Sequence, residues 1–251
     1  MTDLSGQVAI VTGGGRGIGR ACVDLLAAAG AKVMACSRGT RPDDLPDTIE
    51  WRTADVSLTQ DVEKLFSECG TALGPCTVLV NNAGVQVEKT VAASTDADFD
   101  MVVGINCRGV FNGCRAFLNQ PDARGAIINI GSISGNISDP EMALYNASKA
   151  FVHGLTRSIA VDHGPKVRCN AVSPGWIMTE MADAAFALAN DPAAAKTDAL
   201  ARHASNRFGE PTDVARTVLW LADPLNSFVT GQCITVDGGV TSASPLQPGL
   251  F

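Results

Sequence analysis

Short apolar runs rich in β-branched residues alternate with amphipathic helical patterns along most of the chain. The first run covers residues 7–12, and Ile18, Cys22, Leu25 and Leu26 then recur at the three- and four-residue spacing of one helix face. Further strands are predicted at residues 32–37, 49–53, 77–80, 126–130, 166–172 and 232–236. Continuous apolar strands that alternate with helices predict an α/β fold with a doubly wound, mostly parallel sheet of about seven strands and helices on both faces.

Further helices follow from the same periodicity, at Val62, Leu65 and Phe66 and over residues 99–118, 145–163 and 211–221. The polar Asn106 interrupts the apolar face of the 99–118 helix. A buried asparagine needs hydrogen-bond partners, so Asn106 either organises a local kink or lies at the surface. Residues 38–49 hold two prolines and show no periodicity, which predicts an irregular connection without a helix.

No linker-like stretch or composition shift divides the chain. We therefore expect one domain over residues 1–240 and a peripheral tail over residues 241–251, in which Leu246, Leu250 and Phe251 could contact a neighbouring subunit. An alanine-rich segment over residues 180–208 is a candidate lid.

Composition narrows the class of protein. Hydrophobic residues make up 46% and charged residues 18% of the 251, which is typical of a soluble globular protein. The net charge of -7 argues against a nucleic-acid surface. The sequence shows no targeting segment and no apolar run long enough to span a membrane, so we expect a cytoplasmic protein. The eight cysteines are scattered without nearby histidines, which predicts small reduced core residues and no metal site.

Four of the six residues after Thr12 are glycines, and Gly19 follows Ile18, between the first predicted strand and the first helix. In that position, backbone N–H groups and the helix dipole can meet a pyrophosphate without side chains in the way. The turn therefore indicates a dinucleotide-binding fold of the Rossmann type.

The end of the second predicted strand indicates which dinucleotide is bound. An acidic residue there would accept the 2′-hydroxyl of NAD, but this strand ends in Ser37 and Arg38. A guanidinium can bind a 2′-phosphate, and Arg16 in the glycine turn could approach the same group. This pattern favours NADP(H) over NAD(H), unless both arginines are merely solvated.

Tyr145 and Lys149 form the strongest candidate for chemistry. Four residues apart on a helix, they share one face, so the ammonium group can come close to the phenol. A nearby cation favours the phenolate and should move its pKa down toward neutral pH, where acid–base catalysis is efficient. Tyr145 is the only tyrosine in the chain, so no other phenol can substitute for it.

Taken together, these features resemble the short-chain dehydrogenase/reductase family. Five motifs in order carry the resemblance over nearly the whole chain: Thr12-Gly-x-x-x-Gly17-x-Gly19, Asp55, Asn81-Asn-Ala-Gly84, Ser132 thirteen residues before Tyr145 with Lys149, and Pro174-Gly175. Many members carry a second serine immediately before the catalytic one. Gly131 stands there in this chain, a difference that we expect to be harmless.

The resemblance implies a role for each matched residue. Tyr145 would be the general acid/base, Lys149 would lower its pKa and hold the nicotinamide ribose, Ser132 would orient the substrate oxygen, and Asn106 would hold a water of the proton relay. The implied cofactor-binding residues are Gly13, Gly15, Arg16, Gly17, Ile18, Gly19, Ser37, Arg38, Asp55, Val56, Asn82, Ala83, Gly84, Tyr145, Lys149, Pro174, Gly175, Ile177 and Thr179. The resemblance also implies a homotetramer or homodimer.

The sequence thus predicts an NADP(H)-dependent oxidoreductase that interconverts a secondary alcohol and a ketone, a small-molecule substrate. A non-catalytic NADP-binding sensor or scaffold, an enoyl reductase and an NAD-dependent alcohol dehydrogenase remain alternatives. We expect the substrate pocket to be walled by residues 85–89, 136–144 and 176–208, with Met142, Trp176, Met178, Met181 and Phe186 making it apolar. Asp139 and Glu141 argue against an anionic substrate, unless these acids face solvent.

Overall fold

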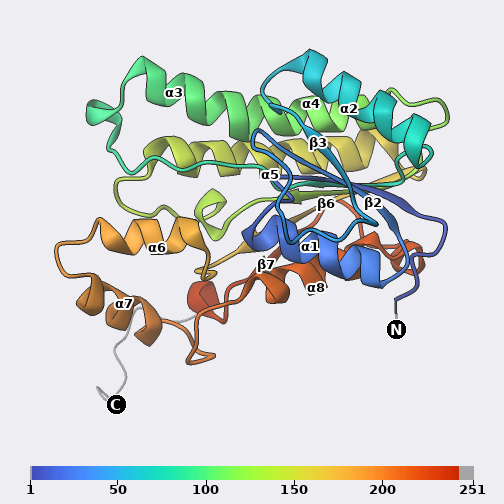
Figure 1. The fold of residues 1–251 in the computed structure, drawn as a ribbon. Helices are drawn as coiled ribbons and strands as arrows, with labels where there is room; N and C mark the ends of the chain where they lie inside the picture. Colours follow the sequence, from blue (N-terminus) through green and yellow to red (C-terminus); the bar gives the residue numbers. More distant parts are fainter. Residues whose placement is uncertain (1, 243–251) are drawn as a thin grey trace.

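Seven parallel strands form the centre of the computed structural model, which describes residues 2–242 (Figure 1). They are β1 (Val8–Thr12), β2 (Lys32–Ser37), β3 (Glu50–Thr53), β4 (Val78–Asn81), β5 (Gly125–Ile130), β6 (Val167–Pro174) and β7 (Cys233–Val236). Their order in the sheet is β3-β2-β1-β4-β5-β6-β7, and every neighbouring pair is parallel. The predicted doubly wound parallel sheet is confirmed, and the predicted strand bounds differ from those observed by two residues at most.

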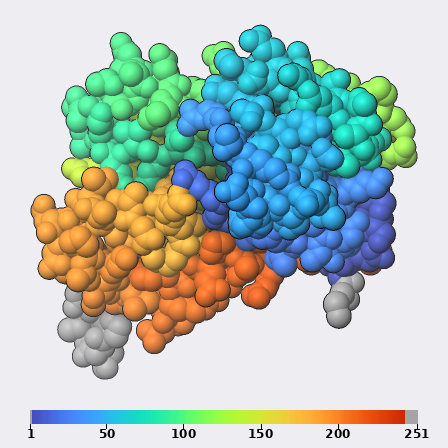
Figure 2. All heavy atoms as spheres, viewed as in Figure 1, coloured from blue at the N-terminus to red at the C-terminus, as the bar shows by residue number. Residues whose placement is uncertain are grey.

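Helices cover both faces of this sheet. The helices are α1 (Gly17–Ala28), α2 (Thr59–Ala72), α3 (Asp96–Val102), α4 (Val110–Leu118), α5 (Ala143–His163), α6 (Glu180–Ala187), α7 (Pro192–Ala201) and α8 (Pro211–Ala222). In Figure 1, α2, α4 and α5 lie above the sheet and α1 and α8 below it. The two short helices α6 and α7 project to one side, and Figure 2 shows this segment in orange beside the N-terminal part of the molecule.

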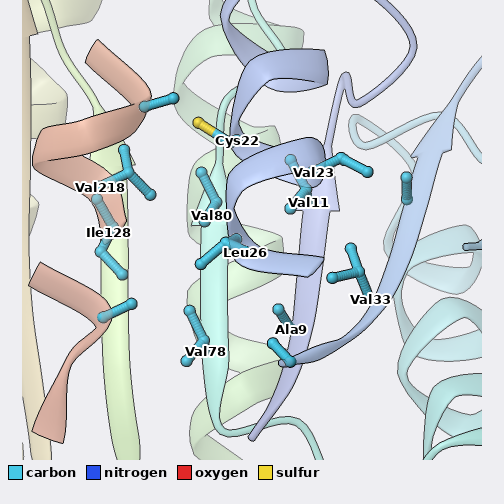
Figure 3. Close-up of a cluster of buried hydrophobic side chains, with 14 of the residues drawn as sticks. Ala9, Val11, Cys22, Val23, Leu26, Val33, Val78, Val80, Ile128 and Val218 are labelled. Carbon is cyan, nitrogen blue, oxygen red and sulfur yellow. The ribbon is translucent and has the colours of Figure 1, made fainter. Parts of the chain in front are cut away.

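Alternate residues of each strand enter two separate cores, as the two-residue period of a strand requires. On β1, Ala9 and Val11 face the core between the sheet and helices α1 and α8. Val8 and Ile10 face the core between the sheet and helices α2, α4 and α5. Figure 3 shows the first of these cores, where Leu26 of α1 packs over the strands. Burial on both faces explains why the central strands β1, β4 and β5 are largely apolar in sequence, whereas the edge strand β3 is not buried and carries Glu50 and Arg52.

The strand order places the loops that matter for function. The chain runs outward from β1 to β2 and β3, and then returns to the other side of β1 with β4. The connections on either side of this reversal diverge, so a crevice opens at the carboxyl ends of β1 and β4. The loops after β1, β4, β5 and β6 all reach this edge.

The predicted helix over residues 99–118 is present, and it is interrupted around Asn106. A π-helical stretch, Val103–Gly109, separates α3 from α4, and Asn106 lies in it with only 1% of its surface exposed. Its side chain bonds the backbone of Val85 rather than water at the surface. Of the two alternatives for Asn106, the local distortion is therefore the observed one, because a π-bulge re-aims one residue of a helix toward a partner.

Two other local predictions are confirmed. Residues 38–49 form no helix, and the Arg41 guanidinium there donates to the carbonyls of Ile49, Leu45 and Pro46 at 2.8–3.0 Å. The eight cysteines are free thiols, and all but Cys233 are buried.

The segment predicted as a lid contains α6 and α7. The predicted tail, with Leu246, Leu250 and Phe251, lies outside the described residues except for Thr241 and Ser242. Among the helices of residues 2–242, none combines the length and apolar character that a membrane crossing requires.

Leu26→Ala should lower the free energy of unfolding by about 3 kcal/mol, because Leu26 is fully buried and a large-to-small change leaves a cavity. Urea unfolding of the two proteins measures the difference. The control is Val161→Ala on α5, where the side chain is 82% exposed and the change should stay within about 0.5 kcal/mol. Equal losses in both variants would contradict the assigned core.

Candidate active site

A cavity of about 1040 Å³ lies at the carboxyl end of the sheet. It runs from the glycine turn and the end of β2 to α5 and the segment after β6. Eighteen of the predicted cofactor residues line it, namely Gly13, Gly15, Arg16, Gly17, Ile18, Ser37, Arg38, Asp55, Val56, Asn82, Ala83, Gly84, Tyr145, Lys149, Pro174, Gly175, Ile177 and Thr179. Ser132 lines it as well, so three of the four predicted catalytic residues share one cavity with the glycine turn.

The glycine turn is fastened to the loop after β4. The Thr12 hydroxyl accepts the N–H groups of Asn82 and Ala83 at 3.0 and 3.1 Å, and the Asn82 amide donates to the carbonyls of Thr12 and Gly13 at 2.9 and 3.1 Å. Gly13 and Gly17 have φ of 66° and 54°, a region that favours glycine. Asn82 therefore shapes the turn at the start of α1, whose N-terminus faces the cavity.

Gly19 is the one predicted cofactor residue that does not line the cavity. It is buried on α1, and a Cβ there would lie 2.8 Å from the carbonyl carbon of Gly13. Its glycine allows the helix to pack directly under the turn, which is a supporting role rather than a ligand contact.

The far end of the cavity carries the features expected around an adenosine. Ser37 and the exposed Arg38 lie there beside Asp55, whose carboxylate accepts the N–H and hydroxyl of Ser57 at 2.9 and 2.7 Å. Trp51 also lines this end and was missed from the sequence, where an aromatic residue on a strand gives no signal of a ligand. A Cβ on Gly15 would come 3.2 Å from the Trp51 ring, so the glycine keeps this part of the cavity open.

Arg16 is not free to meet a phosphate in this arrangement. Its guanidinium forms an ion pair with Glu180, the first residue of α6. Both side chains are largely exposed, so the pair contributes little to stability. It does connect the glycine turn with the predicted lid.

The residues around the cavity fit a dinucleotide. The glycine turn leads into the N-terminus of the twelve-residue helix α1, where backbone N–H groups and the helix dipole favour binding of a pyrophosphate. One continuous cavity then reaches from that turn to Tyr145 and Lys149, and basic Arg38 stands at its outer end.

Tyr145 and Lys149 lie on adjacent turns of α5, as predicted. The Lys149 ammonium is 5.4 Å from the centre of the Tyr145 ring and donates to the Ile130 carbonyl at 2.9 Å. Ser132 follows β5 two residues after Ile130 and is buried beside the phenol. One helix and one strand end thus supply the phenol, the ammonium group and the hydroxyl.

The predicted lowering of the tyrosine's pKa is not found in this arrangement. Burial raises the pKa of Tyr145 to about 12, a hydrogen bond between Ser132 and the phenol opposes this rise, and the Asp139 carboxylate adds to it. Burial also lowers the pKa of Lys149 to about 8. The ammonium lies over the ring face and bonds Ile130 rather than the phenol oxygen, so desolvation of the phenol outweighs the cation.

Asn106 lies beneath the cavity wall rather than in it. Its carbonyl accepts the Val85 N–H at 2.9 Å, and its amide donates to the Val85 carbonyl and the Ser148 hydroxyl at 2.8 and 3.0 Å. A Cβ on Gly84 would be 3.4 Å from Asn106 Oδ1 and 3.7 Å from Lys149 Nζ. Glycine at this position therefore leaves these two side chains close to the cavity.

Two further residues are linked by hydrogen bonds to the predicted catalytic serine. The Ser132 hydroxyl is 3.0 Å from that of Ser134, which donates to the Asp139 carboxylate at 2.6 Å. The chain of hydroxyls links the site to an acid that the sequence analysis placed only in the pocket wall. In the sequence, the only sign of the role of Ser134 is its position two residues after the predicted catalytic serine.

The substrate end is apolar on the lid side, as predicted. Met142, Trp176 and Met181 line it, whereas Phe186 is buried and stacks on Trp176 with ring centres 4.8 Å apart. Met178 does not line the cavity. Within residues 2–242, no cluster of three or more His, Cys, Asp and Glu side chains is arranged to hold a metal ion.

Absorbance of tyrosinate should report the burial of this site, because Tyr145 is the only tyrosine. The folded protein alone should form no tyrosinate through pH 10.5, since its pKa is raised from 10.0 to about 12. The same protein in urea serves as the control and should titrate near the ordinary value. A folded protein that titrates at or below that value would contradict the burial of the phenol.

Comparison with known proteins agrees with this geometry. The family model described as enoyl-(acyl carrier protein) reductase matches residues 13–241. An NADP-dependent (R)-specific alcohol dehydrogenase of Lentilactobacillus kefiri is 37% identical, over 96% of this chain and 100% of that protein. A galactitol 2-dehydrogenase of Rhizobium johnstonii is 38% identical, over 95% of this chain and 96% of that protein.

The solved structure of an aldohexose dehydrogenase from Thermoplasma acidophilum superposes with a TM-score of 0.91, at 32% identity and over 98% of each chain. The matches extend over the sheet, the glycine turn and the helix that carries Tyr145 and Lys149. The chain is therefore an oxidoreductase that belongs to the short-chain dehydrogenase/reductase family.

Proposed function

We propose that the protein is an NADP(H)-dependent oxidoreductase that interconverts a secondary alcohol and a ketone, with Tyr145 as the general acid/base. The observation that carries this proposal is the meeting of Tyr145, Lys149 and Ser132 with the glycine turn in one cavity. A cofactor held along that cavity would have one end among these three side chains.

The cofactor would lie between the N-terminus of α1 and the end of β6. The glycine turn would hold the pyrophosphate, Asp55 and Val56 would lie along the adenine, and Ile177 and Thr179 would hold the carboxamide. When bound, NADP(H) supplies or accepts the hydride. The protein's own part is to bind the cofactor, orient the substrate and move a proton.

The proton transfer follows from the environment of Tyr145. Because burial raises its pKa to about 12, the phenol is neutral at pH 7 and can donate to a substrate carbonyl oxygen. Ser132 would hydrogen-bond the same oxygen and so fix its position beside the phenol. In the direction of alcohol oxidation, the phenolate form must accept the proton, and the ammonium group of Lys149 stabilises that form.

The preference for NADP(H) rests on the end of β2. Ser37 offers no carboxylate to repel a 2′-phosphate, and Arg38 is exposed at the cavity's outer end. Arg16 is a weaker candidate because it is paired with Glu180. The name of the NADP-dependent relative supports the same choice.

The alternatives account for less of the site. A protein that only bound the cofactor would not need Ser132 and Tyr145 together at the substrate end of the cavity. The name of the family model suggests an enoyl reductase, but the relatives from Lentilactobacillus kefiri and Rhizobium johnstonii are named as dehydrogenases of alcohols. An NAD-dependent alcohol dehydrogenase would use the same catalytic residues, and the Arg38 variant below separates it from the proposal.

Tyr145→Phe should lower the rate of ketone reduction by at least about a thousandfold, because it removes the only phenolic proton in the site. Its dissociation constant for NADPH should stay within about twofold of the wild type, since the ring is retained. Steady-state kinetics on a ketone panel and a binding titration measure the two effects. Turnover at near wild-type rates in this variant would refute the mechanism.

Arg38→Ala should weaken NADPH binding about tenfold or more and leave NADH nearly unchanged, since a charged hydrogen bond to phosphate is lost only with NADPH. Arg124→Ala is the matched control, because Arg124 is exposed and pairs with Asp122 just before β5. Equal losses for both cofactors in Arg38→Ala would contradict the assignment of the 2′-phosphate.

A further inference from the structure

His153 lies directly behind the loop that carries Ser132. It stands on α5 one turn after Lys149 and two turns after Tyr145, and only 2% of its surface is exposed. Neither its position on the helix nor its burial is needed for the proton transfer described above. The surroundings of its ring show what it does.

The imidazole bridges two segments that end at the cavity. Nδ1 is 3.2 Å from Asn136 Oδ1, and Nε2 is 3.0 Å from the Ser173 hydroxyl. Since a carbonyl oxygen can only accept, Nδ1 carries the proton and Nε2 accepts from Ser173. Asn136 closes the short turn after Ser132, and Ser173 precedes Pro174 at the end of β6.

Two glycines beside Ser132 make room for this ring. A Cβ on Gly131 would lie 2.9 Å from Cδ2 of His153, and a Cβ on Gly135 would lie 2.8 Å from Nδ1. Neither glycine has a positive φ, so the backbone itself does not require glycine there. The space taken by the imidazole accounts for the glycine at position 131, where a serine would overlap the ring. At Gly135 the backbone of Lys149, 2.9 Å from the same Cβ position, adds to the crowding.

Helix α5 therefore holds the Ser132 segment at two points. Lys149 Nζ bonds the Ile130 carbonyl on one side of Ser132, and the His153 ring fills the space against Gly131 and Gly135 on both sides. Tyr145 stands on the same helix, so both points fix the serine relative to the phenol.

We propose that His153 is a positioning residue that holds Ser132 in register with Tyr145, a role that rests on the function proposed above. A neutral ring suits this role, because it keeps one donor toward Asn136 and one acceptor toward Ser173. Burial, Lys149 and Arg157 all lower the pKa of His153, which keeps the ring neutral at pH 7.

The first test measures the packing without turnover. We expect Gly131→Ser to destabilise the wild type strongly in urea unfolding and to cost much less in the His153→Ala background, where the space is free. Independent sites add, whereas residues in contact show coupling. Additive effects of the two changes would overturn the proposal, whether or not any substrate has been found.

The second test measures catalysis. His153→Ala should lower kcat by about 10–100-fold, the loss expected of a misplaced catalytic group, and leave the NADPH dissociation constant within about twofold. In the Ser132→Ala background the same change should lower kcat by less than about twofold, because the serine through which His153 acts is gone. His153→Gln, which keeps a donor and an acceptor, should recover most of the lost rate.

His163→Ala serves as the control, because His163 is an exposed histidine at the end of the same helix. If His153→Ala does not fold, Ser173→Ala removes only the hydroxyl partner of Nε2 and should lower kcat by about 3–10-fold, again without effect in the Ser132→Ala background. If the change lowers kcat by the same factor in the wild type and in the Ser132→Ala background, the residue acts through Lys149 or the fold rather than through Ser132. That result would overturn the proposal.

The outcomes separate the two proposals. If turnover by the wild type does not depend on Tyr145, the proposed function is refuted, and the positioning role is refuted with it. A wild type with normal, Tyr145-dependent turnover and a His153→Ala variant of unchanged kcat would refute the positioning role alone.

Discussion

The hydrogen bond from Lys149 to the Ile130 carbonyl joins the two elements on which the site depends. It ties α5, which carries the phenol, to the end of β5, which carries the serine, and its length is 2.9 Å. Both partners are buried, so leaving either one unpaired would be costly. The parallel sheet supplies the rest of the arrangement, because the carboxyl ends of its central strands meet at one edge.

Burial of the site has two opposing consequences for its chemistry. It keeps Tyr145 protonated and therefore ready to donate, and it brings the pKa of Lys149 close to neutral pH. The same desolvation strengthens each electrostatic contact that the site makes. In the proposed mechanism, the phenol would act as a proton donor beside a cation whose own pKa lies close to neutral pH, rather than as a phenol whose pKa is already lowered.

Much of this could be predicted from the sequence. The alternation of strands and helices, the glycine turn and the meeting of Tyr145, Lys149 and Ser132 follow from local patterns and from the resemblance that they carry. What the sequence did not reveal was long-range: the partner of Asn106 in the π-helix is Val85, 21 residues away, whose backbone bonds the Asn106 side chain. The pKa of Tyr145 depends on how deeply the phenol is buried, which spacing along a helix does not reveal.

Gly131 is a second case in which a contact between residues far apart in sequence could not be predicted. In sequence it is a harmless departure from a common pattern, but in the folded chain it faces His153, 22 residues further on. The contact between Gly131 and His153 exists only because the loop after β5 packs against α5 in the folded protein, so neither residue predicts the other in sequence.

The most direct measurement uses NADPH that carries deuterium in place of both hydrogens at C4 of the nicotinamide, in the reduction of a ketone in ordinary water. The account predicts one deuterium on the carbinol carbon of the product and a hydroxyl proton drawn from the protein and solvent. An alcohol without deuterium on that carbon would contradict hydride transfer in this cavity, and with it the central claim.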